Sequence, residues 1–162
     1  TFRHTYSGRR VTGVAGKKNF TVIFLEKSLM NAEIGFTYRV LAVFLKHGIS
    51  FEHIPTGIDT MSFVVDSAIL KNGVLEEVCA EIQENVRPDN LRIINDIALI
   101  AVVGHGMARS VGTSARLFEA IARAGVNVRM IDQGSSELNI IVGVDNENYE
   151  RTLKAVYEEF FE

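Results

Sequence analysis

The sequence predicts an α+β fold of two βαββαβ modules with antiparallel sheets, and this prediction rests on an internal repeat. The segments that begin at Met30 and Met107 are similar and lie 77 residues apart (107 − 30). The same offset relates three pairs of glycines, which are Gly35 and Gly112, Gly48 and Gly125, and Gly57 and Gly134. A constant offset over these positions indicates a tandem duplication with no insertion between the copies.

Each copy has the pattern strand, helix, strand, strand, helix. The first strands are expected at 21–25 and 97–103, because both runs are short, apolar and rich in β-branched residues. The first helix of each copy is expected to end at Gly48 or Gly125, where a C′ residue adopts a positive φ. The later strands are expected at 49–54 and 61–65 in the first copy, and at 126–131 and 138–144 in the second.

Apolar residues at helical spacing indicate which face of each helix is buried. In the first helix of the second copy this stripe is Val111, Ala115, Phe118 and Ala122. In the last helix of each copy the stripes are Leu75, Val78, Cys79, Ile82 and Val86, and Tyr149, Leu153, Val156 and Phe160.

A fourth strand completes each unit as a ferredoxin-like sandwich. The first copy has this strand at 91–94, whereas the second copy ends in a helix, so the strand at 10–15 is expected to complete the second sheet. This topology inserts the first module into the second; the alternative is a swapped or missing edge strand. The expected domains are 17–95, and 9–16 together with 96–162, with 1–8 as a linker remnant.

The composition excludes several classes of protein. The 162 residues carry 17 Lys and Arg against 20 Asp and Glu, a formal net charge of −3, which argues against a nucleic-acid partner. The single cysteine, Cys79, excludes an internal disulfide framework and a cysteine-rich zinc site. No apolar run is long enough to span a membrane, so a cytoplasmic protein is expected.

No catalytic or metal-binding motif is found in the sequence. Gly8 and Gly13 have the spacing of a phosphate-binding loop, but Val14 stands where the following Lys is required. The four histidines have no metal-ligand spacing, and no acid–base or nucleophile constellation is present. We therefore expect no catalytic residues, no metal and no cofactor in this chain.

One arrangement points to a ligand. The helix that begins after Gly35 offers free backbone N–H groups at Gly35, Phe36 and Thr37, which can receive the α-carboxylate of an amino acid. Glu52, on the next strand, can receive a side-chain ammonium, whereas the second copy has Arg129 at that position (52 + 77). The alternative reading is that Glu52 is an exposed strand residue without a ligand.

Two segments carry a resemblance to a known family. Gly-Phe-Thr-Tyr-Arg-Val-Leu-Ala-Val-Phe-Leu-Lys-His-Gly-Ile-Ser (35–50) and Asp-Gln-Gly-Ser-Ser-Glu-Leu-Asn-Ile (132–140) resemble the C-terminal regulatory region of aspartate kinases. That region is a pair of ACT domains, and the resemblance extends from about Arg9 to Phe161. It implies the inserted topology, a homodimer formed through the ACT domains, and feedback inhibition of aspartate phosphorylation by lysine or threonine.

The resemblance also implies site residues. In lysine-sensitive members the effector lies in the first module at a dimer interface, against a Met-x-x-Ser-x-Gly-Phe loop and a Ser-Val-Asp strand. Here these positions are Met30, Glu33, Gly35, Phe36, Ser50, Phe51 and Glu52. Glu33 replaces Ser and is expected to leave a second negative charge nearby. Gln133 and Asn139 fall in a motif near a threonine site in threonine-sensitive relatives; alternatively they bond across the module interface.

The kinase domain of that family begins with Lys-Phe-Gly-Gly-Thr, which is absent from this chain. The resemblance therefore implies a regulatory part whose partner is a kinase domain that uses ATP and Mg²⁺. The main alternative is the ACT-domain regulatory subunit of another biosynthetic enzyme, such as the valine-binding subunit of acetohydroxyacid synthase. An RNA-binding module or a small enzyme of this fold fits less well, because the sheet strand 138–142 lacks aromatic residues and no acid–base set is present.

Overall fold

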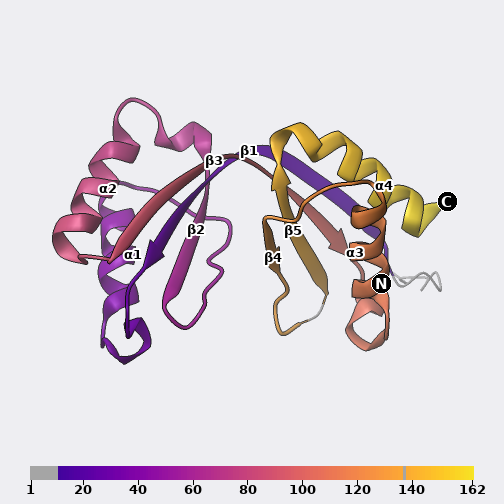
Figure 1. Ribbon diagram of the computed structural model, residues 1–162, viewed down its shortest axis with the longest axis horizontal. Helices are drawn as coiled ribbons and strands as arrows, with labels where there is room; N and C mark the ends of the chain where they lie inside the picture. Colours follow the sequence, from indigo (N-terminus) through magenta and orange to yellow (C-terminus); the bar gives the residue numbers. More distant parts are fainter. Residues whose placement is uncertain (1–10, 137) are drawn as a thin grey trace, which may run out of the picture. The chain divides into compact units, whose positions relative to one another are not determined.

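The computed structural model describes residues 11–136 and 138–162, so the expected linker remnant at 1–8 lies outside the described residues. The strands are β1 (Gly13–Glu26), β2 (Thr60–Asp66), β3 (Asn90–Val103), β4 (Met130–Asp132) and β5 (Asn139–Asp145). The α-helices are α1 (Phe36–Lys46), α2 (Val74–Asn85), α3 (Thr113–Arg123) and α4 (Tyr149–Phe161). Short 3-10 turns, η1 (Met30–Ala32), η2 (Ser67–Leu70), η3 (His105–Arg109) and η4 (Asn146–Asn148), precede the helices (Figure 1).

The strands form an antiparallel sheet in the order β2-β1-β3-β5-β4. β1 pairs with β2 and β4 pairs with β5, both antiparallel. Between β1 and β3, Thr12 N–H donates to the Val103 carbonyl at one end, and Asp89 N–H donates to the Glu26 carbonyl at the other, both at 2.8 Å. This pattern confirms the predicted α+β fold with antiparallel pairing.

β1 and β3 replace four of the predicted strands. Each strand is 14 residues long, and their first residues, Gly13 and Asn90, are 77 residues apart (90 − 13). Residues 13–15 of the strand expected at 10–15 lie with the strand expected at 21–25 in one continuous strand, β1, while residue 10 lies outside the described residues. The strands expected at 91–94 and 97–103 likewise form one strand, β3 (Figure 1). Polar residues such as those at 16–19 interrupt the apolar pattern, but they stay extended because a strand requires backbone partners rather than apolar side chains.

The second strand of each copy also differs from the prediction. Residues 49–54 form no continuous strand, and His53 makes only an isolated bridge to Val64. In the second copy the strand expected at 126–131 is reduced to β4. β5 begins 79 residues after β2 (139 − 60), so the second hairpin is two residues longer. The two copies therefore keep the predicted constant offset only up to this hairpin, where the second copy has two additional residues.

The chain divides into two compact units. The first module is Asn19–Ile97, and the second module is formed by residues 11–18 together with Ala98–Glu162. In each module two helices cover one face of the strands, α1 with α2 and α3 with α4 (Figure 1). Each module has its own buried core. The domain boundaries expected from the sequence, 17–95 and 9–16 with 96–162, stay a prediction.

The two cores use different side chains at corresponding positions. In the first module the rings of Phe44 and Phe63 lie 4.7 Å apart, and Phe51 meets each of them edge-on at 6.4 and 6.1 Å. The corresponding residues of the second module are aliphatic: Ile121, Val128 and Val142. The first module is therefore held by an aromatic trio that fixes the position of Phe51.

The helix α3 buries a different face from the predicted one. Instead of Val111, Ala115, Phe118 and Ala122, its buried residues are Thr113, Leu117, Ala120 and Ile121. Gly112 takes φ 90° immediately before the helix, so the helix begins at Thr113, and Val111 is 96% exposed. The Thr113 hydroxyl donates to the Ser110 hydroxyl at 3.0 Å, which permits its burial.

Gly16 in β1 carries the first testable prediction. A Cβ at this position would lie 2.6 Å from Tyr149 Cε2 and 3.0 Å from the Leu99 carbonyl oxygen. Gly16→Ala is therefore expected to destabilise the chain by about 1–3 kcal/mol, because strand or helix backbone has to shift. Gly13→Ala is the matched control in the same strand, since its added Cβ meets nothing within 4 Å. Thermal unfolding checks this, and equal melting temperatures for the two variants would contradict it.

Candidate functional site

The segment between β1 and α1 is a compact loop. Leu29 takes φ 59°, and the carbonyls of Leu29 and Met30 accept from the N–H groups of Ala32 and Glu33 at 2.9 and 3.2 Å. Gly35 takes φ 80° immediately before the helix. Met30 and Phe36 are buried in the core of the first module, so both anchor this loop through packing.

Glu33 is neutralised by two cations. Its carboxylate pairs with Lys27 Nζ at 2.6 Å and with the Arg39 guanidinium. The hydrogen bond from Lys27 is the main reason that the pKa of Glu33 lies below its ordinary value, and Arg39 adds to it. The second negative charge expected at Glu33 is therefore compensated by these two cations. The group of Lys27, Glu33 and Arg39 carries a net positive charge instead.

The start of α1 retains free backbone donors. Phe36 N–H donates to the Glu33 carbonyl at 3.3 Å, and Arg39 N–H donates to the Gly35 carbonyl at 3.0 Å. The N–H groups of Thr37 and Tyr38 belong to the first helical turn, which has no carbonyl of its own helix to bind. Both residues are exposed. An anion at this helix start would therefore meet the amides of Thr37 and Tyr38 rather than that of Phe36.

The segment 50–52 lies on the surface next to the aromatic trio. Ser50 and Glu52 are exposed, and Phe51 is 39% exposed because one edge of its ring remains outside the core. Glu52 N–H donates to the Val64 carbonyl at 2.8 Å, which fixes its backbone against β2. Among residues 11–136 and 138–162, the Glu52 carboxylate forms no ion pair.

Among the described residues, neither the two hollows nor the side-chain contacts bring the expected site residues together. Met30, Phe36 and Ile49 share one core, but no hydrogen bond or ion pair in the described part of the chain joins Ser50 or Glu52 to the loop 30–37. The structure has a hollow of about 370 Å³ between α1 and α2 and one of about 510 Å³ between α3 and α4, and neither includes Glu52. The candidate site is therefore an open surface.

The second candidate pair lies on the β4–β5 hairpin of the second module. Gln133 follows β4 and is exposed, whereas Asn139 is the first residue of β5 and is half-buried. Glu137, between them, lies outside the described residues. No described contact brings Gln133 and Asn139 to a common ligand position.

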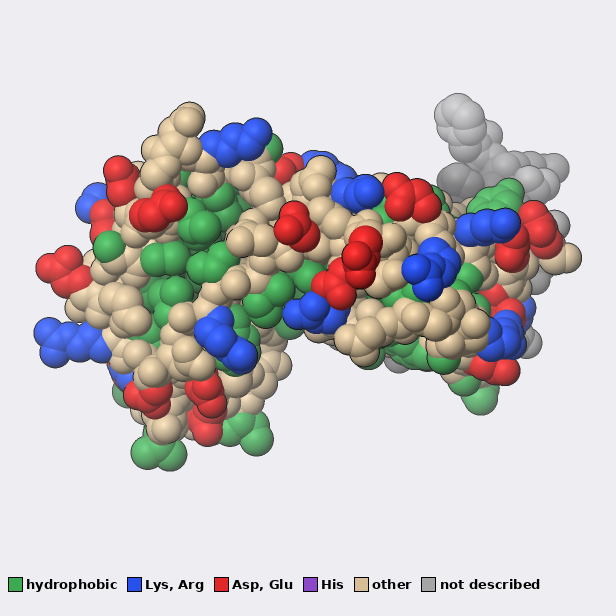
Figure 2. Space-filling model, turned by 45° about the horizontal axis from the view of Figure 1, so that its top comes forward, with side chains coloured by type: hydrophobic (Ala, Val, Ile, Leu, Met, Phe, Trp, Pro, Cys, Tyr) green, Lys and Arg blue, Asp and Glu red, His purple; other side chains and the backbone are tan. Residues whose placement is uncertain are grey.

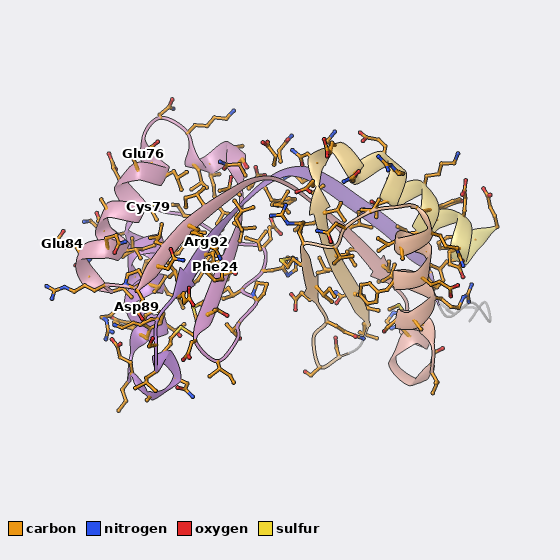
Figure 3. The ribbon with its side chains drawn as sticks, in the orientation of Figure 1. Phe24, Glu76, Cys79, Glu84, Asp89 and Arg92 are labelled. Atoms are coloured by element: carbon orange, nitrogen blue, oxygen red, sulfur yellow. The ribbon has the colours of Figure 1, made fainter. Side chains whose placement is uncertain are left out.

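Sequence reasoning missed the residues that hold the loop. Lys27 also donates to the Val86 carbonyl at 3.0 Å and lies 5.5 Å from the Phe36 ring centre. Asp89 accepts from Ser28 N–H at 2.7 Å, and this bond is the main cause of its lowered pKa. Asp89 follows α2 and lies far from Ser28 in sequence, so no spacing rule could find the contact (Figure 3).

On the face shown in Figure 2, charges of the two signs are mixed rather than segregated. Figure 2 shows acidic and basic side chains interspersed over one face, with a group of apolar side chains on the first module at the left. In the described part of the chain, no group of three or more His, Cys, Asp or Glu side chains lies together as metal ligands would. None of the described helices is long and apolar enough to cross a membrane.

Ion pairs and hydrogen bonds to carboxyl groups predict how stability depends on pH. The pKa values of four carboxyl groups, Glu33, Glu81, Asp89 and Glu159, are lowered by their partners in the folded chain. A lowered folded pKa stabilises the fold above the ordinary value of 4.5 for Glu and 3.8 for Asp, and this stabilisation is lost as pH falls through the lowered values. The melting temperature should therefore fall steadily below about pH 4.5.

Glu33→Gln isolates one of these contributions. The variant is expected to be less stable than the parent chain near neutral pH, and to lose less further stability in acid. Melting temperatures between about pH 6 and pH 3 check this, and parallel curves for the two chains would contradict the role of Glu33.

Comparisons with known proteins identify this arrangement. A model of the ACT domain matches residues 100–160. Aspartokinase 3 of Bacillus subtilis is 38% identical over 151 residues, covering 93% of this chain and 33% of the relative. The regulatory subunit of aspartate kinase from Thermus flavus has a TM-score of 0.78 at 25% identity, covering 94% of this chain and 99% of that subunit. Over nearly its whole length, the chain is therefore similar to the ACT regulatory regions of aspartokinases.

The chain is also similar to part of a longer solved enzyme. Clostridium acetobutylicum aspartate kinase has a TM-score of 0.89 at 45% identity, covering 93% of this chain and 34% of that one. The chain thus spans about a third of the length of the curated relatives it matches first, 33% and 29%. The comparisons do not favour a subunit of acetohydroxyacid synthase.

Proposed function

We propose that this chain is the effector-sensing part of an aspartate kinase, and that it binds lysine in feedback inhibition of aspartate phosphorylation, with threonine as the other candidate effector. The observation that supports lysine is the contrast between the two acidic residues of the site. Glu33 is paired with Lys27 and Arg39, whereas the exposed Glu52 has no ion pair among the described residues. Only Glu52 is free to receive an additional ammonium.

The α-carboxylate of an amino acid suits the start of α1. The amides of the first turn and the helix dipole favour a carboxylate, and the net positive charge of Lys27, Glu33 and Arg39 adds to this preference. The exposed helix terminus contributes about 0.3–1 kcal/mol. The proposed effector contacts are Met30, Glu33, Gly35, Phe36, Thr37, Ser50, Phe51 and Glu52, with Met30, Phe36 and Phe51 acting mainly through packing.

An open surface binds a small ligand weakly unless a partner covers it. Leu29, Ile34 and Tyr38 next to the helix start are 72%, 96% and 75% exposed. We propose that a second copy covers this surface in a homodimer. We further propose that effector binding is transmitted to a kinase domain that uses ATP and Mg²⁺ in the cytoplasm. The similar Clostridium acetobutylicum aspartate kinase is an allosteric enzyme. A coupling of about 1–3 kcal/mol suffices for such control.

Gln133 and Asn139 remain candidates for a second effector site or an interface.

Thermal unfolding with added amino acids tests this function. At about a hundredfold excess over Kd, a bound effector stabilises the fold by about 2.7 kcal/mol. Lysine is expected to raise the melting temperature by roughly 5–10 °C, and valine, the ligand of the alternative function, should leave it unchanged. The absence of a shift with millimolar lysine or threonine would contradict an effector site, and a shift with valine alone would favour the alternative.

A further inference from the structure

Lys27, the residue directly after β1, caps a helix to which it does not belong. Residues 74–85, which form α2, include no basic side chain, although the carbonyls at a helix C-terminus lack partners within their own helix. Lys27 Nζ donates to the carbonyl of Val86, the C-cap residue of α2, at 3.0 Å. A cation at this end also interacts favourably with the helix dipole. Lys27 therefore supplies the positive charge that α2 does not carry at its C-terminal end.

The same ammonium holds the loop that precedes α1. Lys27 Nζ lies 2.6 Å from the Glu33 carboxylate and 5.5 Å from the centre of the Phe36 ring. An ammonium has three N–H donors, so it can bind a carbonyl and a carboxylate at the same time. The Lys27 side chain is 20% exposed, and hydrogen bonds of a charged group are strong where water is largely excluded. One ammonium is thus shared between the loop and the end of α2.

A second contact ties the same two segments. Asp89, which lies between α2 and β3, accepts from Ser28 N–H at 2.7 Å, and its own N–H donates to the Glu26 carbonyl at 2.8 Å. These bonds fix the backbone on both sides of Lys27. Because the backbone is already ordered, the contacts of the Lys27 side chain cost little additional conformational entropy.

The second module does not repeat this arrangement. The positions 77 residues after Lys27 and Glu33 are Gly104 and Ser110, which carry no charge. Gly104 has no side chain, so this position cannot supply a cation to the end of α4. The shared ammonium is therefore a feature of the module that carries the candidate effector site.

We propose that Lys27 is a positioning residue that couples the loop 27–37 to the C-terminal end of α2, so that an effector bound at this loop stabilises both segments. Energetic coupling is carried by contiguous contacts, and here one ammonium makes the contact on both sides. A ligand that orders the loop holds Glu33, and through it Lys27, in place against Val86. The role in effector sensing rests on the proposed function, whereas the coupling is present in the free chain and is tested without an effector.

Amide hydrogen exchange of the 162-residue chain, without added amino acid, tests the coupling. In Lys27→Met the N–H groups of Glu33 in the loop and Val86 at the end of α2 should both exchange about tenfold faster, because each segment loses a charge-assisted hydrogen bond. Lys27→Arg should restore both rates, since a guanidinium can bind the same carbonyl and carboxylate. Lys46→Met is the matched control: it removes the ion pair with Glu81 between α1 and α2 and should leave both rates unchanged.

Saturating lysine tests the role in effector sensing. In the parent chain lysine should slow exchange at both N–H groups. In Lys27→Met, at equal occupancy, it should slow exchange at Glu33 and leave the rate at Val86 unchanged. A merely structural role of Lys27 would lower the affinity for lysine without separating the two responses.

The outcomes separate the coupling from the effector. The proposal is overturned if Lys27→Met accelerates exchange at one of the two N–H groups alone, or if Lys46→Met accelerates both equally. It is also overturned if both N–H groups still respond to lysine in Lys27→Met. If neither lysine nor threonine binds the parent chain, the proposed function is wrong, and the exchange rates without amino acid decide the coupling. If Lys27→Met does not fold, Lys27→Gln replaces it in both arms.

Discussion

Glu52→Gln is expected to weaken lysine binding by about 10- to 100-fold and to leave threonine binding nearly unchanged. A charge-assisted hydrogen bond shielded from water contributes roughly 1.5–3 kcal/mol, and each 1.4 kcal/mol is a factor of ten in Kd. Threonine has no side-chain ammonium, so it loses little when the carboxylate becomes an amide. Calorimetric titration of the parent chain and of Glu52→Gln with lysine and with threonine measures the difference.

Glu84→Gln is the matched control for this prediction. Glu84 is exposed on α2 in the same module, and the substitution makes the same change of charge outside the candidate site (Figure 3). Both affinities should remain those of the parent chain. If Glu52→Gln weakened lysine and threonine equally, the role of Glu52 as the ammonium receptor would be wrong.

Phe44→Ala is expected to cost the first module about 3–5 kcal/mol, the largest effect on stability that we predict. Phe44 is 1% exposed, and its ring contacts both Phe63 and Phe51. Its removal leaves a cavity and also removes the support of Phe51, which lies between Ser50 and Glu52. Lysine affinity is therefore expected to fall together with the melting temperature.

Phe51→Ala distinguishes the contribution of a partly exposed ring from that of the buried Phe44 ring. Because Phe51 is 39% exposed, its truncation should cost clearly less than that of Phe44. Chemical denaturation measures both losses. A loss for Phe51→Ala equal to or larger than that for Phe44→Ala would contradict the packing described for the aromatic trio.

The repeat made the fold class predictable. Paired glycines 77 residues apart located the helices of both copies, and the positive φ expected at Gly48 and Gly125 is confirmed at 64° and 68°. The long strands were not predictable in this way. The polar residues at 16–19 resemble a break, although backbone hydrogen bonding continues through them into β1.

The buried face of α3 shows a second limit of pattern reading. Val111 has the right spacing for an apolar stripe but lies before Gly112, the residue that precedes the helix. Which face the pattern assigns to the core therefore depends on where the helix begins. A hydrogen-bonded threonine, Thr113, occupies the core face instead. Periodicity counts apolar residues and cannot anticipate a buried polar one.

The electrostatics of the candidate site could not be predicted from sequence. The partners of Glu33 are the residue that follows β1 and a residue in the first turn of α1, and only the folded loop brings these two cations to its carboxylate. Glu52 and the helix start could be identified from residue type and helix physics alone. Their joint use by one ligand stays a prediction.

A crystal structure of the chain with lysine tests the central claim most directly. The account predicts one lysine in the first module, with its α-carboxylate on the amides of Thr37 and Tyr38 at the start of α1 and its ε-ammonium within hydrogen-bond distance of Glu52. A lysine bound only in the second module, or with its ε-ammonium directed away from Glu52, would contradict the account.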